Sequence, residues 1–162
     1  PVAERKFPAM STGEGWTFDA VVRGLLHGDC IALTRVFETI GSDPRRSAIV
    51  QWVEAGAFAS EPVALAEALT TACWLGEVEV ARYLLDLGVD PLAGNGTGMN
   101  ALHWAANRGQ LAVVELLLSR GVSTHVRSRY GGTVLDTAIW SAEHEPKPDH
   151  ARIIAALSPS QR

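Results

Sequence analysis

The stretch ALHWAANRGQLAVVELLLSRG, residues 101–121, decides the fold. Its first part, residues 101–106, is rich in alanine, which favours a short helix with a small-residue face. Its second part, residues 113–118, carries apolar side chains at helical spacing and forms a broad stripe. Gly109 separates the two parts, and Gly121 stands where a left-handed residue commonly ends a helix. The stretch therefore predicts two short helices joined by a glycine turn.

The same pattern recurs at an interval of 33 residues. Four features match across this shift: residues 66–73 with 99–106, residues 80–85 with 113–118, Gly76 with Gly109, and Gly88 with Gly121. Residues 133–138 begin a third copy, and the register holds without a gap from Glu67 to Trp140. A single helix pair cannot bury such a stripe alone, so we expect neighbouring pairs to stack and share one core.

In residues and spacing, this unit resembles the ankyrin repeat. The family pattern is T-P-L-H-x-A-A, a glycine between two helices, V-V-x-L-L-L and a closing glycine. Asn100 and Ala101 replace its Thr-Pro, and His103 is matched by Thr70 and Asp136 in the flanking copies, so the central copy is the most faithful. The resemblance covers about residues 62–157. It implies an all-α ankyrin-repeat solenoid of stacked helix pairs with short hairpin-like turns.

The region before the regular repeats predicts a degenerate helix pair over residues 18–40. Gly28 holds the place between its two helices, but it precedes Gly76 by 48 residues, which exceeds the repeat interval by 15. The surplus falls in residues 43–56, where Asp43-Pro44 is a helix start and an apolar face follows. We therefore expect one inserted helix, with Trp52 in the core.

The last copy departs from the register. Pro146 and Pro148 predict an extended loop, and the second-helix residues 153–157 come about seven positions late. This segment is either a cap that closes the stack or a modified repeat followed by others. The whole chain then divides into a flexible arm (1–15), a degenerate repeat plus inserted helix (16–61), and ankyrin repeats with a modified C-terminal cap (62–162).

Composition narrows the classes of function. The net charge of −4 argues against a nucleic-acid partner, which requires a basic face. Cys30 and Cys73 lie in apolar helical patterns, which predicts buried thiols rather than a disulfide framework. No run of 18 apolar residues predicts a membrane span. Residues 1–12 lack the apolar core of a signal peptide, although one already removed would leave the same pattern. We expect a cytoplasmic, monomeric protein.

No motif assembles a catalytic site, so we expect no enzyme, no cofactor and no metal. The glycine-rich residues 94–98 lack the Lys-Ser/Thr of a phosphate loop and fall where the family turns its hairpin. His103 matches the histidine of the family pattern, which implies a structural role bonded to neighbouring backbone. Residues 143–150 hold His144, His150 and three carboxylates. A solvated loop is the expectation there, and a metal-dependent enzyme is the remote alternative.

The resemblance also implies where a partner binds: on hairpin tips and on the variable faces of the first helices. Carrying these places through the 33-residue register selects eight candidates: Trp74, Met99, Trp104, Asn107, Arg108, Arg129, Tyr130 and Trp140. Gly96 and Thr97 fall at a tip as well. Tryptophan, tyrosine and arginine dominate interface hot spots. The alternative for Trp74 and Trp140 is packing against their own loops.

These residues favour a protein–protein interaction module, such as an adaptor. Residues 108–129 contain four arginines but only one acidic residue, Glu115. This positive excess would suit an acidic partner, and the alternative is that the arginines are simply solvated: Arg108, Arg120, Arg127 and Arg129. A sharper alternative is a bacterial inhibitor or immunity protein that blocks the active site of an enzyme, because the chain is small and acidic. The sequence does not identify the partner, since repeat scaffolds share a fold and differ in surface.

Overall fold

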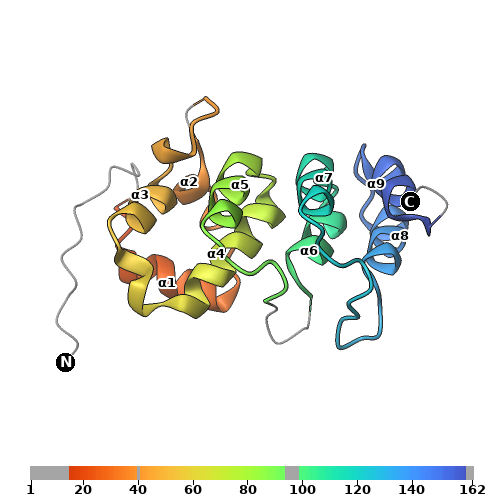
Figure 1. The fold of residues 1–162 in the computed structure, drawn as a ribbon, viewed down its shortest axis with the longest axis horizontal. Coiled ribbons are helices and arrows are strands. Elements are labelled where there is room, and N and C mark those ends of the chain that lie inside the picture. Colours follow the sequence, from red (N-terminus) through yellow and green to blue (C-terminus); the bar gives the residue numbers. More distant parts are fainter. Residues whose placement is uncertain (1–14, 40, 94–98, 160–162) are drawn as a thin grey trace.

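The fold is a single row of helix pairs, seen in a computed structural model that describes residues 15–39, 41–93 and 99–159 (Figure 1). Its α-helices, in chain order, are α1 (Phe18–His27), α2 (Thr34–Phe37), α3 (Ala48–Glu54), α4 (Pro62–Leu75), α5 (Val78–Asp86), α6 (Ala101–Asn107), α7 (Leu111–Ser119), α8 (Val134–His144) and α9 (His150–Leu157). Every regular element in the described segments is helical, with 3-10 turns at Pro44–Arg46 and Ala57–Ser60. None of these helices is long and apolar enough to cross a lipid bilayer. The predicted all-α stack is confirmed.

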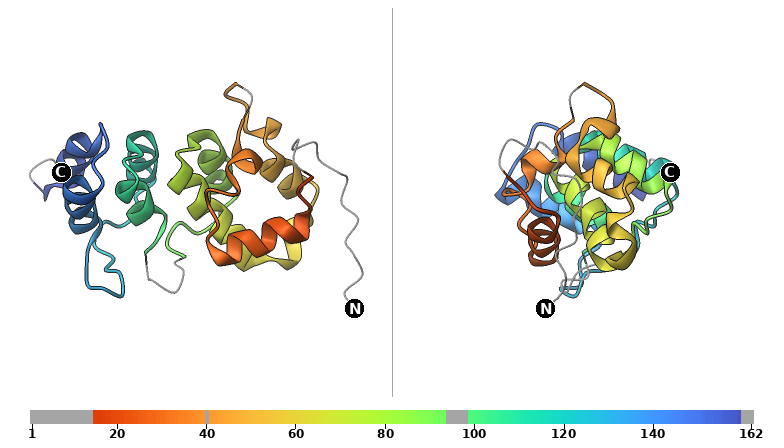
Figure 2. Two further views of the ribbon diagram at one scale, coloured as in Figure 1. Left: turned by 180° about the vertical axis from the view of Figure 1, so that it is seen from behind. Right: turned by 90° about the vertical axis from the view of Figure 1, so that its left-hand side faces the viewer.

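The regular part of the row consists of the pairs α4/α5, α6/α7 and α8/α9. The first helices α4, α6 and α8 pack against one another more extensively than the second helices α5, α7 and α9 do. This closer packing bends the row toward the first helices and makes their side concave. The end-on view in Figure 2 shows the pairs lying largely behind one another, as a single row requires.

The core is continuous from pair to pair. The residues of the deciding stretch that it buries most completely are Ala101, Leu102, Ala105, Ala106, Val113, Val114 and Leu117, each at most 1% exposed. The alanines allow α4 and α8 to approach α6 from both sides, and α7 lays its stripe over the same layer. Burying one valine or leucine side chain contributes roughly 1.5–3 kcal/mol. Most of that burial depends on neighbouring repeats.

The degenerate pair differs from its prediction in the second helix. α1 packs against α4 in the place of a first helix, but α2 is a single turn. Turns precede it, so the side chain of Ile31 is 76% exposed instead of buried. Leu33 fills the space beside α1, where Gly24 lacks a side chain. Ile40, the end of the predicted pair, lies outside the described residues.

The predicted inserted helix is α3, and it completes the outer side of the degenerate repeat together with α2. Trp52 of α3 is 1% exposed, as its apolar pattern indicated. Phe18 of α1 meets Phe58 and Trp52 edge-on, with ring centroids 4.9 Å and 6.0 Å apart. These aromatic contacts join α1, α3 and the 3-10 turn that precedes α4. The domain boundary at residues 61 and 62 stays a prediction.

At both junctions between regular repeats, a polar side chain of the later repeat bonds to a backbone carbonyl of the earlier one, and we call this contact a lock. The Gln110 Nε2 group donates a hydrogen bond to the carbonyl oxygen of Trp74 at 3.1 Å. The aligned glycines at the helix ends have positive φ, among them Gly76 (80°) and Gly109 (71°). A methyl group on Gly76 would overlap the Gln110 side chain. Glycine is therefore favoured there by the backbone conformation, and its lack of a side chain leaves room for the Gln110 amide of the next repeat.

His150 makes the corresponding lock in the last repeat. Its Nδ1 accepts a hydrogen bond from the Lys147 backbone N–H at 2.9 Å, so Nε2 carries the proton. Nε2 donates to the carbonyl oxygens of Ala106 at 3.0 Å and Asn107 at 3.2 Å. Asn107 is the register partner of Trp74, and His150 follows Gln110 by one interval plus the seven inserted residues. The loop between α8 and α9 thus accommodates the seven inserted residues, and the hydrogen bonds from the last repeat to α6 are retained.

His103 is a buried member of a helix cap. The Asn100 Oδ1 atom accepts from the backbone N–H groups of Leu102 and His103, and His103 Nδ1 accepts from the Asn100 N–H at 3.3 Å. Asp136 makes the same reciprocal bond to Thr133 at the start of α8. Burial lowers the pKa of His103, whose side chain is fully buried. The structural role that the resemblance implied for this residue is confirmed.

We expect His150→Ala to lower the free energy of unfolding by about 1–2 kcal/mol, because it removes the imidazole donor from the Asn107 carbonyl and leaves the Ala106 carbonyl only its backbone donor, the Gly109 N–H. His150→Gln is the matched variant, since Gln110 makes the same lock in the preceding repeat. It should stay within about 1 kcal/mol of the native chain. Urea denaturation followed by circular dichroism measures both. Equal losses in the two variants would show that the lock contributes little.

Protonation of His103 should destabilise the fold at acid pH. Its folded pKa lies below the unfolded value of about 6.5, so the unfolded chain binds the proton more readily below that pH. The free energy of unfolding should then fall as the pH drops from about 7 toward 5, by at most about 1.4 kcal/mol per pH unit. In His103→Gln the capping bond survives and this titration is removed. Denaturation series at several pH values test this, and identical pH slopes would contradict it.

Candidate functional site

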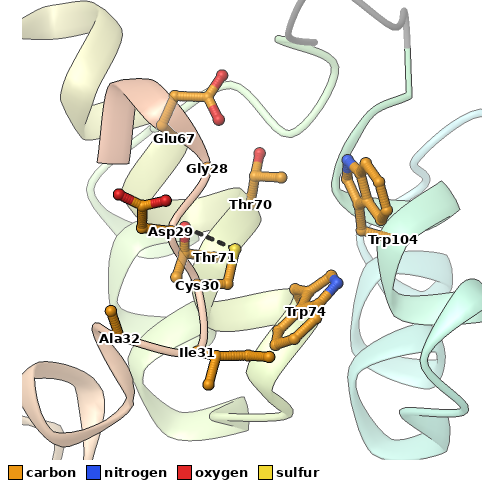
Figure 3. A pocket seen from close by; sticks show the side chains of 10 residues that line it. All are labelled: Gly28, Asp29, Cys30, Ile31, Ala32, Glu67, Thr70, Thr71, Trp74 and Trp104. Atoms are coloured by element: carbon orange, nitrogen blue, oxygen red, sulfur yellow. Dashed lines mark hydrogen bonds between the residues drawn. The ribbon is translucent and has the colours of Figure 1, made fainter. Parts of the chain in front are cut away.

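Two tryptophans of the concave side face a cavity at the end of the regular repeats. Trp74, near the end of α4, and Trp104, on α6, are both half-buried. They line a cavity of about 550 Å³ together with the turn at residues 28–32 and with α4 residues (Figure 3). The figure shows the two indoles on one side, the turn on the other and Thr70 and Thr71 between them. Two predicted site residues are therefore brought together around one hollow.

Arg108 joins two repeats through Trp74. Its guanidinium carbon lies 4.2 Å from the centroid of the Trp74 ring, which is a cation–π contact. The Nε atom of Arg108 is buried and has no hydrogen-bond partner among the described residues. The contact holds the indole in place on α4. It also means that the guanidinium of Arg108 already has a partner inside the stack.

Asn107 is also engaged within the stack. Its Nδ2 group donates a hydrogen bond to the Oγ atom of Ser141 at 2.8 Å, and Ser141 is fully buried. The bond links the end of α6 to the middle of α8. The amide therefore has a structural role that the sequence analysis did not include, and partner contact by Asn107 stays a prediction.

The hairpin tip between α7 and α8 presents Tyr130. Its side chain is 77% exposed, whereas the backbone beneath it is fixed by several hydrogen bonds. The Ser128 backbone N–H donates to the Gly132 carbonyl at 2.9 Å, and Arg127 Nη1 donates to the Gly131 carbonyl at 2.6 Å. An exposed aromatic ring on an ordered turn can enter an interface at little entropic cost.

The other candidates at tips and helix faces differ in exposure. Trp140 on α8 is 51% exposed and stacks on His144, with ring centroids 4.3 Å apart and planes inclined by 11°. Arg129 is exposed beside Tyr130, and Met99 is half-buried before α6. Gly96 and Thr97 lie outside the described residues. Partner binding at these positions stays a prediction.

The arginines that suggested an acidic partner are largely engaged inside the chain. Arg120 pairs with Asp86 at 2.6 Å and so links α7 to α5. Arg127 closes the hairpin turn, and Arg108 lies on Trp74. The positive charge at this end of the molecule therefore serves contacts within the stack.

The loop that held the remote metal alternative has its imidazoles in other contacts. His150 uses both ring nitrogens in the lock to α6, and His144 Nδ1 bonds the Trp140 carbonyl oxygen at 2.8 Å. In the described part of the chain, no group of three or more histidine, cysteine or acidic residues is arranged to hold a metal ion. The sequence did hold a signal for the role of His150: it lies one repeat interval plus the seven inserted residues after Gln110, which makes the equivalent bond.

The cavity itself was missed by sequence reasoning. Its turn wall comes from the degenerate repeat, which lies outside the 33-residue register. Glu67 in this cavity aligns with Asn100 and Thr133, which cap α6 and α8. α4 begins five residues earlier, at Pro62, so Glu67 lies inside a helix and serves no cap. Burial raises the pKa of its carboxyl group.

Known proteins share the repeat segment of this chain. A 64-residue stretch, 40% of the chain, is 38% identical to 11% of an L-asparaginase of Dirofilaria immitis. An 86-residue stretch, 52% of the chain, is 37% identical to 3% of an E3 ubiquitin-protein ligase of Caenorhabditis elegans. A 53-residue stretch, 33% of the chain, is 47% identical to 30% of the DNA replication inhibitor plutonium of Drosophila melanogaster. The chain thus spans less than a third of the length of each of these relatives.

The family match covers the regular part of the stack. The sequence model described as Ankyrin repeats (3 copies) matches residues 69–155, more than half of the chain. These residues run from within α4 into α9 and include the aligned glycines Gly76, Gly109 and Gly121. Ankyrin repeats form a non-enzymatic fold that acts in protein–protein interaction. With its repeat interval, its helix pairs and this match, the chain belongs to the ankyrin-repeat family.

Proposed function

We propose that the chain is a non-enzymatic adaptor that binds a protein partner through the concave side of its stack and the hairpin tip at Tyr130. The observation that carries the proposal is the set of indole and phenol rings left accessible on this side. Trp140 and Tyr130 are 51% and 77% exposed, and Trp74 and Trp104 open onto the cavity. Aromatic rings of this kind dominate the energetics of protein interfaces.

The rigidity of the scaffold supports the same proposal. Trp74 is held by Arg108, and Tyr130 sits on a hydrogen-bonded turn. Side chains that are already ordered lose less conformational entropy when a partner binds. The stack therefore offers fixed anchor points, and a partner gains affinity from contacts that need no refolding of the surface.

The charge of the partner stays a prediction. At the hairpin end, where an acidic partner was expected, Arg127 closes the turn and Arg129 is exposed to solvent. The names of the relatives describe whole proteins, of which the shared repeat segment makes up 30% or less. We therefore transfer the interaction role and none of their activities. The inhibitor version of the proposal and a cytoplasmic location stay predictions.

Affinity capture with the double variant Trp104→Ala, Tyr130→Ala tests the proposal. Removing two hot-spot aromatics costs about 2 kcal/mol or more in binding, so the affinity for the captured partner should fall at least about 30-fold. Mass spectrometry identifies the partner, and isothermal titration calorimetry measures both affinities.

The matched control is Leu87→Ala, Arg82→Ala, because both side chains are exposed at α5 on the outer side of the stack. This variant should bind like the native chain. Thermal denaturation followed by circular dichroism confirms that both variants are folded. If the Trp104→Ala, Tyr130→Ala variant recovers the same partner with native affinity, the proposed surface is wrong.

A further inference from the structure

The cavity between the degenerate repeat and the first regular repeats has walls of two kinds. Trp74 and Trp104 supply aromatic rings, and Ile31, 76% exposed, extends the apolar wall at the turn. Asp29 and Glu67 supply carboxylates. A hollow with aromatic and acidic walls differs from an ordinary gap between helices, which apolar side chains would fill.

The carboxylates produce a negative potential inside this hollow. Burial raises the pKa of the Cys30 thiol, and the charges of Glu67 and Asp29 act in the same direction. The Cys30 Sγ atom lies 3.7 Å from the Thr71 Oγ1 atom on the cavity floor. Glu67 and Asp29 form no ion pair with a basic side chain in the described segments, and none of the residues lining the cavity is basic. The negative charge is therefore not neutralised from within the described chain.

The aromatic wall is suited to a cation as well. An indole face attracts a positive group through its quadrupole, and the attraction grows when the site is shielded from water. Trp74 already binds one cation in this way, the guanidinium of Arg108. Trp104, one repeat further along, has no ring partner of this kind among the described residues. The hollow thus combines aromatic faces and uncompensated carboxylates, the two elements that recognise a cationic group.

We propose that this cavity receives a lysine or arginine side chain of the protein partner. The proposal rests on the proposed function, since it places the partner on the concave side, and it adds the chemistry of one anchor. The cationic end group lies between the indole of Trp104 and the carboxylate of Glu67, and its aliphatic stem lies along the apolar wall at Ile31. A cavity of about 550 Å³ has room for one such side chain.

The position of Glu67 explains how this repeat comes to have the site. The equivalent residues Asn100 and Thr133 use their side chains to cap α6 and α8. Glu67 is released from capping because α4 begins at Pro62, and its carboxyl group is half-buried at the cavity wall. The degenerate repeat adds the turn that carries Asp29. The site therefore requires both irregular features of the N-terminal half.

Titration with short peptides tests the proposal without a known partner. The probes are capped tripeptides with a central lysine, arginine or norleucine between two glycines, and norleucine matches lysine in shape without the charge. Nuclear magnetic resonance follows the indole N–H signals of the five tryptophans, assigned by Trp→Phe variants. We expect the Trp104 signal to shift and saturate with the lysine or the arginine peptide, with affinity in the millimolar range. Whichever of these two peptides binds more tightly identifies the preferred side chain.

Charge variants separate recognition by the cavity carboxylates from attraction of the cationic peptide to the negative charge of the whole protein. Glu67→Gln should weaken the peptide affinity about fivefold, the upper end of the effect of one solvent-exposed ion pair. Asp29→Asn, on an exposed turn, should weaken it in the same direction. Glu115→Gln removes the same charge from the exposed face of α7 and should leave the affinity unchanged. Circular dichroism verifies the fold of each variant.

Three results would overturn the proposal: no shift with any peptide, equal shifts with norleucine, or native affinity in Glu67→Gln. The outcome is separable from that of the capture experiment. A partner lost by Trp104→Ala, Tyr130→Ala together with a negative peptide titration keeps the interaction function and removes the cation anchor. A positive titration with an unaffected partner keeps the anchor chemistry and removes the interaction surface.

Discussion

Burial between neighbouring repeats is the interaction on which the rest of the structure depends. α6 buries alanine and leucine side chains toward α4 on one side and α8 on the other, so its core positions are completed only by those neighbours. This constraint explains the small residues of the first helices, because larger ones would separate the pairs. It also leaves the concave side to residues that the core does not need, and we propose these residues for partner binding.

Hydrogen bonds between repeats determine which of these residues remain free. The locks made by Gln110 and His150 satisfy carbonyl groups at the ends of α4 and α6. The first junction differs, because the position of Gln110 is occupied there by Glu77. Burial, and the nearby charge of Glu38, raise the pKa of Glu77. An ionised carboxylate cannot donate to a carbonyl oxygen, so Glu77 does not make this lock at the junction between the degenerate repeat and the regular ones.

The sequence predicted what depends on local pattern and failed where distant contacts decide. The repeat interval, the glycine turns and the inserted helix with Trp52 follow from spacing and are present. Ile31 was expected in a helix because its neighbours have helical spacing, yet a turn places it at the cavity. His150 was weighed as a metal ligand because its partners, the carbonyls of Ala106 and Asn107, are more than 40 residues away. The cavity was not predicted from the sequence, because two irregular segments form it together.

The irregular N-terminal half and the regular repeats therefore contribute different things to recognition. Regular repeats fix aromatic rings at constant intervals, which supplies orientation and area. The degenerate repeat breaks the interval, and the break leaves a hollow beside α4 whose carboxylates no chain residue neutralises in the described segments. A uniform array would have placed a capping residue at Glu67 and a helix at Ile31, and the hollow would be absent. Loss of regularity thus creates the acidic hollow that we propose as the site for a cationic side chain.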